Sequence, residues 1–127
     1  MSTRKWQFRL RDMLESSRKI QSYIQGLSFD DFCDDEKTMD AVIRQLTVIG
    51  EASAHIPREI AVAYPEIPWD VIRGMRNVIV HEYFGVNIRI VWTTANKNIP
   101  ELHNRLEKLI QKLAEEGKCT HESLGDD

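Results

Sequence analysis

Residues 39–50, Met-Asp-Ala-Val-Ile-Arg-Gln-Leu-Thr-Val-Ile-Gly, carry the clearest periodic pattern of the chain and decide its fold class. The apolar side chains recur at steps of three and four along this stretch: Met39, Val42, Ile43, Leu46 and Ile49. This spacing places them on one face of an α-helix, which completes a turn about every 3.6 residues. Gly50 lies on the same face and lets a neighbouring helix approach closely. The stretch therefore predicts an amphipathic helix packed against other helices.

The segments on either side of this helix also follow a helical period. Residues 10–27 hold a second apolar stripe with the same spacing, which predicts another long helix. Ser28 begins a capping-box pattern and so predicts a short helical turn over residues 29–33. Pro57 is suited to open a short helical segment, and we expect that segment over residues 58–63.

The second half of the chain predicts two more long helices. One is expected from about residue 69 to residue 83 and the other over residues 87–113, with Asn87 as its N-cap. Pro100 lies inside the last helix and removes one backbone hydrogen bond, so we expect a bend near residues 95–96. The whole pattern predicts an all-α, up-and-down bundle of four long helices with one or two short ones.

The composition is that of an ordinary globular protein, because 42 % of the 127 residues are hydrophobic and 29 % are charged. It excludes collagen-like, membrane-embedded and wholly disordered proteins. We expect one domain over residues 1–127, with a frayed acidic tail at residues 115–127. The two cysteines, Cys33 and Cys119, are far apart and fit a reducing environment. No apolar signal segment opens the chain, so we expect a cytoplasmic protein without a membrane anchor.

Charge is spread unevenly along the chain, although the formal net charge is only −3. Residues 1–19 hold six lysines and arginines against two acidic residues, whereas residues 28–36 hold five acidic residues and no basic one. A dedicated duplex-DNA-binding domain is strongly basic, so this function class is excluded unless a local patch supplies the charge. We interpret the charged stretches as solvated surface, with docking of a partner as the alternative.

Residues 71–83 stand apart because polar side chains run along an otherwise apolar helix. Arg73, Asn77 and His81 are four residues apart and fall along one stripe, and Arg76 lies one turn from Arg73. Two explanations compete. The stripe either forms hydrogen bonds across the bundle or with solvent, or it binds an anionic ligand. Arginine offers forked donors to phosphate, and histidine exchanges a proton near neutral pH, so the second explanation is chemically specific.

Residues 76–83, Arg-Asn-Val-Ile-Val-His-Glu-Tyr, are similar to the signature of the HEPN superfamily: an arginine, a polar residue, three spacers, a histidine, one spacer and a tyrosine. Within this superfamily the chain resembles the HepT toxin family more closely. Further blocks match the pattern of that family in order: residues 28–32, 41–46, 49–52, 64–69, 74–77 and 83–86. The resemblance covers roughly residues 8–113 and implies a HEPN-like helical bundle.

This resemblance implies a metal-independent endoribonuclease toxin of a type II toxin–antitoxin system, with no cofactor. Its site would form where the two protomers of a homodimer bring their motif helices together. Carried over by residue, Arg76 and His81 take the catalytic positions and Asn77 takes the adjacent polar one. The family also implies a partner, an MntA-type minimal nucleotidyltransferase antitoxin, which transfers AMP to Tyr83 and silences the toxin. The alternative is a non-catalytic HEPN domain that docks a nucleotidyltransferase or binds nucleotides.

The residue types of the motif suit RNA cleavage by in-line attack of a ribose 2′-hydroxyl on the adjacent phosphate. His81 of one copy is suited to act as the base and His81 of the other as the acid, since histidine titrates near neutral pH. Arg76 from both copies would bind the phosphate and offset its developing charge. Tyr83 has a structural alternative, in which it packs in the bundle with its hydroxyl at the rim.

Arg44 and Glu51 lie seven residues apart, two turns along one face of their helix. Together with Arg73 they are expected to support the site. Two interpretations stay open for Arg44 and Glu51. They are either partners of Arg76 or His81 in the same cleft, or they form an interhelical ion pair.

The remaining conspicuous side chains have structural interpretations. His55 and His103 are isolated histidines on polar stretches, so we expect both at the surface. Trp69 and Trp92 are expected to anchor helix packing or a dimer face. The His and Cys residues lack the spacing of a zinc site.

Overall fold

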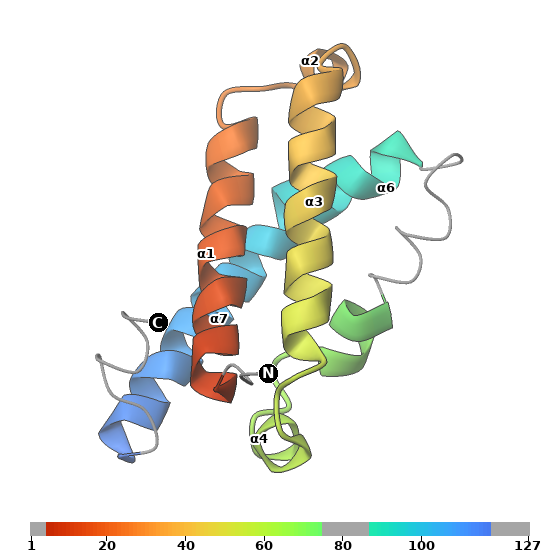
Figure 1. Cartoon of the computed structure of the whole chain (residues 1–127). Coiled ribbons are helices and arrows are strands. Elements are labelled where there is room, and N and C mark those ends of the chain that lie inside the picture. The colour runs from red at the N-terminus through yellow and green to blue at the C-terminus, as the bar shows by residue number, and fades with distance from the viewer. Residues whose placement is uncertain (1–4, 75–86, 118–127) are drawn as a thin grey trace.

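The computed structural model describes residues 5–74 and 87–117 (Figure 1). Every regular element in these residues is a helix, so the expected all-α class is confirmed. The elements, in chain order, are α1 (Trp6–Ile24), α2 (Phe29–Cys33), α3 (Glu36–Ser53), α4 (Arg58–Ala63), α6 (Ile88–Thr93), the π-helix η2 (Thr94–Asn98) and α7 (Ile99–Glu115). Residues 69–74 are also helical.

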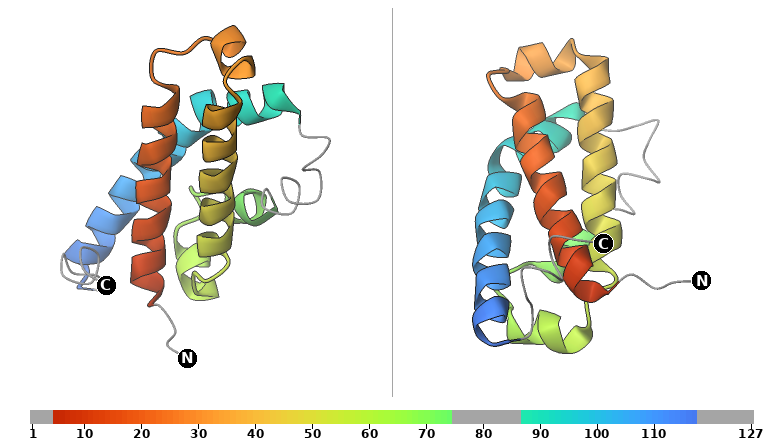
Figure 2. Two further views of the ribbon diagram at one scale, coloured as in Figure 1. Left: turned by 45° about the horizontal axis from the view of Figure 1, so that its top comes forward. Right: turned by 60° about the vertical axis from the view of Figure 1, so that its left-hand side comes forward.

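The core of the bundle lies between three long helices. α1 packs against both α3 and α7 and lies between them (Figure 1, Figure 2). The buried side chains at these contacts include Leu10, Met13 and Ile20 of α1, Val42, Leu46 and Ile49 of α3, and Leu102, Leu106 and Leu109 of α7. The apolar stripes predicted from the sequence are therefore the packed faces of the helices. Tyr23 recurs with the same spacing as the apolar residues of α1, but unlike them it is 36 % exposed.

The short helix α2 begins with the expected capping box and lies at one end of the bundle (Figure 1). The Ser28 hydroxyl accepts a hydrogen bond from the Asp31 N–H at 3.1 Å, and the Asp31 carboxylate accepts one from the Ser28 N–H at 3.0 Å. These bonds, first the one from the Ser28 backbone, hold the pKa of Asp31 below its usual range. Phe32 is fully buried, and its ring centroid lies 5.3 Å from that of Trp92 on α6. Trp92 thus anchors helix packing, as expected.

The long helix expected over residues 87–113 is interrupted. Asn87 caps its start, since its side chain accepts hydrogen bonds from the N–H groups of Arg89 and Ile90. The π-helix η2 then separates α6 from α7, and Pro100 stands in the first turn of α7. Proline lacks the N–H that would continue the α-helical ladder, so the interruption falls where the sequence predicted it. Figure 2 shows α6 turning away from the direction of α7.

His103 is not the isolated surface side chain that the sequence suggested. Its Nδ1 lies 2.8 Å from the hydroxyl of Ser17, which is fully buried on α1, and its Nε2 lies 3.4 Å from a carboxylate oxygen of Glu107. The Ser17 hydroxyl donates to the Leu14 carbonyl oxygen at 2.6 Å, so its oxygen is the acceptor for Nδ1 of His103. The reason is that α1 places this hydroxyl on its packed face, where it gives the ring of His103 on α7 a hydrogen-bond partner. His55, by contrast, is exposed as expected.

The fourth expected long helix and the acidic tail lie only partly within residues 5–74 and 87–117. Three of the four expected long helices are present as α1, α3 and the α6–η2–α7 segment, and the fourth is described only over residues 69–74. α7 ends at Glu115, and most of the expected acidic tail lies outside the described residues. Within residues 5–74 and 87–117, no helix has both the length and the apolar character needed to cross a bilayer.

Candidate functional site

The helix that leads into the arginine-rich motif begins after a tightly bonded loop, residues 64–68. The Trp69 indole Nε1 donates a hydrogen bond to the Tyr64 carbonyl oxygen at 3.0 Å, and the Trp69 backbone N–H donates to the Ile67 carbonyl at 2.8 Å. Pro65 and Pro68 restrict the backbone of the same loop. The loop therefore fixes the point at which the helix starts.

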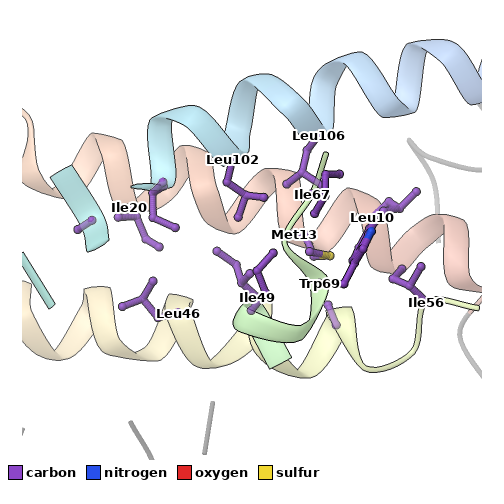
Figure 3. Close-up of a cluster of buried hydrophobic side chains, with 14 of the residues drawn as sticks. Leu10, Met13, Ile20, Leu46, Ile49, Ile56, Ile67, Trp69, Leu102 and Leu106 are labelled. Carbon is purple, nitrogen blue, oxygen red and sulfur yellow. The ribbon is translucent and has the colours of Figure 1, made fainter. Parts of the chain in front are cut away.

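Apolar packing holds the first turn of this helix to the core. Trp69 and Ile72 are buried, and Ile67 of the preceding loop is buried beside them. Figure 3 shows Trp69 and Ile67 in one cluster with Leu10 and Met13 of α1 and Leu106 of α7. Trp69 thus anchors helix packing, as the sequence predicted.

Arg73 is the one member of the expected site on this helix that lies within the described residues. Its Nη1 lies 3.8 Å from a carboxylate oxygen of Asp70, one turn earlier. Its Nε is buried and has no hydrogen-bond partner among the described residues. Arg73 also lines an open groove of about 650 Å³ between α4 and residues 65–73, together with Arg58 and the exposed Val62 and Val71.

Arg44 and Glu51 lie together in a second depression, on the exposed face of α3. This shallow cavity has a volume of about 440 Å³, and its other lining residues are Asp40, Ile43, Thr47 and Val48. The structure therefore brings Arg44 and Glu51 to one cavity, as their seven-residue spacing suggested, whereas Arg73 lines a different groove. Their support of Arg76 or His81 stays a prediction.

The central residues of the expected site, Arg76, Asn77, His81 and Tyr83, lie outside the described residues. The described portion is the approach to the motif: the loop, the first turn of the helix and Arg73.

Polar contacts from α7 and from Glu116, which follows it, reach the loop, and the sequence did not predict them. The Tyr64 hydroxyl donates a hydrogen bond to the Glu116 carboxylate at 2.6 Å, and Arg105 donates through Nη1 to the Glu66 carbonyl oxygen. The bond to Glu116, together with burial and the charges of Glu116 and Glu66, raises the pKa of Tyr64 to about 12. No local pattern marks these partners, because Tyr64 and Glu116 are 52 residues apart.

The fold and these features define a small all-α domain in which the helix that carries Arg73 begins beside the apolar core. A family model described as "Ribonuclease HepT-like" matches residues 13–109, which include every residue expected at the site. The chain therefore belongs to the ribonuclease HepT-like family, and the resemblance noted in the sequence is confirmed.

Individual relatives agree with this assignment. The chain is 43 % identical to "Probable ribonuclease HepT" from Thermococcus cleftensis over 100 aligned residues. These residues cover 79 % of this chain and 91 % of the relative. It is 40 % identical to "Putative RNase TTE0752" from Caldanaerobacter subterraneus over 103 aligned residues. These residues cover 81 % of this chain and 92 % of the relative. No solved structure gives a significant match.

Proposed function

We propose that this protein is a metal-independent endoribonuclease toxin of a type II toxin–antitoxin system, with its RNA-cleaving site formed across a homodimer. The observation that carries the proposal is the family match over residues 13–109, which spans the whole motif of residues 76–83. The relatives that match over most of their length carry the word ribonuclease or RNase in their names.

The reaction proposed is attack of a ribose 2′-hydroxyl on the neighbouring phosphorus. His81 of one copy accepts the proton of the 2′-hydroxyl, and His81 of the other copy donates a proton to the departing 5′-oxygen. The products are a 2′,3′-cyclic phosphate and a free 5′-hydroxyl, so the protons balance. Histidine suits both tasks because its pKa lies close to neutral pH.

Arginine side chains supply the electrostatic part of this mechanism. Arg76 from each copy contacts the phosphate and stabilises the charge that develops on its oxygens. Arg73 lies three residues earlier and adds positive potential on the approach to the phosphate. Asn77 orients His81 or a phosphate oxygen, since its amide does not titrate.

Silencing by a nucleotidyltransferase antitoxin of the MntA type completes the proposal. Transfer of AMP to the Tyr83 hydroxyl adds a phosphate and a purine two residues after His81. The added group competes with RNA for Arg73 and Arg76, both by occupying the site and by its negative charge.

A cleavage assay tests the catalytic claim. Wild-type protein, His81→Ala and the matched control His55→Ala are incubated with single-stranded RNA in the presence of a chelator. His55 is exposed at the end of α3, so its removal leaves cleavage unchanged, whereas His81→Ala abolishes it. No cleavage by unmodified wild-type protein would favour the non-catalytic docking domain instead.

Mixed dimers test whether the two copies share one site. If each cleavage event needs His81 from both copies, an equal mixture of wild-type and His81→Ala chains keeps about a quarter of the activity of wild-type dimers. Retention of about half would mean that each copy acts alone.

Mass spectrometry tests the silencing claim. After co-expression with a nucleotidyltransferase of the MntA type, the wild-type chain gains the mass of one AMP, whereas Tyr83→Phe does not. Tyr23→Phe is the control, because it removes a hydroxyl from α1 and leaves Tyr83 in place. An unmodified Tyr83 would remove this part of the proposal.

A further inference from the structure

Two hydrogen bonds join the loop at residues 64–68 to α7 and to Glu116, the residue that follows α7. One joins the Tyr64 hydroxyl to the Glu116 carboxylate at 2.6 Å. The other joins the Arg105 guanidinium to the Glu66 carbonyl oxygen. We call these four residues, Tyr64, Glu66, Arg105 and Glu116, the loop–α7 clamp.

Tyr64 and Arg105 each make a further contact besides their hydrogen bond in the clamp. Tyr64 is only 3 % exposed, and Nζ of Lys112 on α7 lies 5.4 Å from the centre of its ring. Arg105 also pairs with Glu101, one turn earlier on α7, which orients its guanidinium toward the loop. The bonds of the clamp are charge-assisted, because one partner in each is ionised, and such bonds are stronger and more directional than neutral ones.

The clamp is connected through the backbone to the helix at residues 69–74. The Tyr64 carbonyl oxygen accepts the hydrogen bond of the buried Trp69 indole, so Tyr64 touches α7 with its side chain and Trp69 with its main chain. The Ile72 N–H then donates to the Pro68 carbonyl at 3.0 Å, which begins the helical hydrogen bonding. A shift of Tyr64 therefore moves the start of the helix, and Arg76 follows only a few residues later in the chain.

We propose that Tyr64, Arg105 and Glu116 are positioning residues, which hold the start of the helix at residues 69–74 relative to α7 and thereby help to place Arg76 and His81, later in the chain, for reaction with the phosphate. This inference rests on the proposed ribonuclease function. Tyr64 lies on the loop, Arg105 on α7 and Glu116 directly after α7, and they act through the main chain of the loop.

The substitution Tyr64→Phe tests the first bond. It removes only the hydroxyl and keeps the ring that fills the core, so the fold is retained. A small displacement of catalytic groups lowers the rate of the chemical step, and we expect kcat to fall on the order of ten-fold with KM unchanged. Tyr23→Phe is the matched control and leaves both constants as in the wild type, because Tyr23 lies on the exposed edge of α1.

Substitutions of Arg105 test the second bond and include a rescue. Arg105→Ala lowers kcat as Tyr64→Phe does, whereas Arg105→Lys restores most of it, since an ammonium group also donates to the Glu66 carbonyl. The control is Arg18→Ala, which breaks an exposed ion pair with Glu15 on α1. Wild-type kcat in both Tyr64→Phe and Arg105→Ala would overturn the inference.

Hydrogen exchange separates failure of the clamp from failure of the proposed function. In Tyr64→Phe we expect faster amide exchange at residues 69–74 and unchanged exchange in α3. Unchanged exchange at residues 69–74, or equal acceleration in α3, would overturn the clamp whatever the activity. If wild-type protein cleaves no RNA, the proposed function fails, and the exchange pattern alone then decides whether the clamp holds the helix.

Discussion

The contact between α1 and α3 and the contact between α7 and the loop at residues 64–68 are built in opposite ways. The α1–α3 contact is formed by buried aliphatic side chains, such as Met13 and Leu46, on the stripes of two long helices. The loop is held to α7 by directional hydrogen bonds from Tyr64 and Arg105. The α1–α3 contact mainly stabilises the fold, whereas the hydrogen bonds fix where the loop lies relative to α7.

The physical properties of the two kinds of contact support this difference in role. Full burial of a large aliphatic side chain stabilises a fold by about 1.5–3 kcal/mol, and the α1–α3 contact buries many of them. The charge-assisted bonds of the clamp also contribute to stability, but a hydrogen bond acts only within a narrow range of distance and angle. Loss of an apolar side chain is therefore expected to reduce stability, and loss of a clamp bond is expected to change geometry more than stability.

The largest expected effect on stability comes from the apolar contact. Leu46 is 1 % exposed on α3, and Leu46→Ala is expected to lower the free energy of unfolding by about 2–5 kcal/mol, because it leaves a cavity in the core. Denaturant unfolding measures this loss. The activity of each folded molecule, measured well below the unfolding transition, stays close to that of the wild type.

Val62→Ala is the control for this substitution. Val62 is 68 % exposed, so its truncation changes the free energy of unfolding by no more than about 0.5 kcal/mol. If Leu46→Ala proved as mild as Val62→Ala, apolar packing would not be the main stabilising force between α1 and α3.

A smaller effect is expected at the polar contact between α1 and α7. Ser17→Ala removes the hydroxyl that lies 2.8 Å from Nδ1 of His103 and leaves that half-buried nitrogen without its partner. We expect a loss of about 1–3 kcal/mol in the free energy of unfolding, measured by denaturant.

The double variant Ser17→Ala with His103→Leu sharpens this prediction. Replacing both polar partners by apolar groups removes the desolvation cost, so the double variant is expected to be more stable than Ser17→Ala alone. Equal or lower stability would mean that the Ser17–His103 contact does not account for the loss.

The helices were predictable because their signals are local. The stripe at residues 39–50 predicts α3, the capping pattern at Ser28 predicts α2, and Pro100 predicts the interruption that η2 forms. Each of these signals depends on side chains within a few turns of one another. The same holds for Arg44 and Glu51, whose spacing on one helix places them in one cavity.

Contacts between distant parts of the chain were not predictable. Ser17 and His103 are 86 residues apart, and Glu66 and Arg105 are 39 residues apart. An isolated histidine or arginine on a polar stretch looks like surface until the helix packing places a buried polar group opposite it. For the same reason the sequence did not show that Arg73 lines a different groove from Arg44, since helix packing decides which faces meet.

The smallest expected effect is a pH dependence confined to the clamp. The pKa of Tyr64 is raised from its usual value of 10.0 to about 12, first by the hydrogen bond to Glu116. A group with a raised pKa in the folded state stabilises the fold fully below its unfolded pKa and loses this contribution as pH rises through the folded pKa. The stability difference between the wild type and Tyr64→Phe is therefore expected to be constant up to about pH 10 and to vanish as pH approaches about 12.

Thermal unfolding of both proteins across this pH range measures the stability difference, with Tyr23→Phe as the control for loss of an exposed hydroxyl. A difference that stayed unchanged across this range would show that folding does not raise the pKa of Tyr64, and hence that the Tyr64–Glu116 bond does not hold the loop in the folded state.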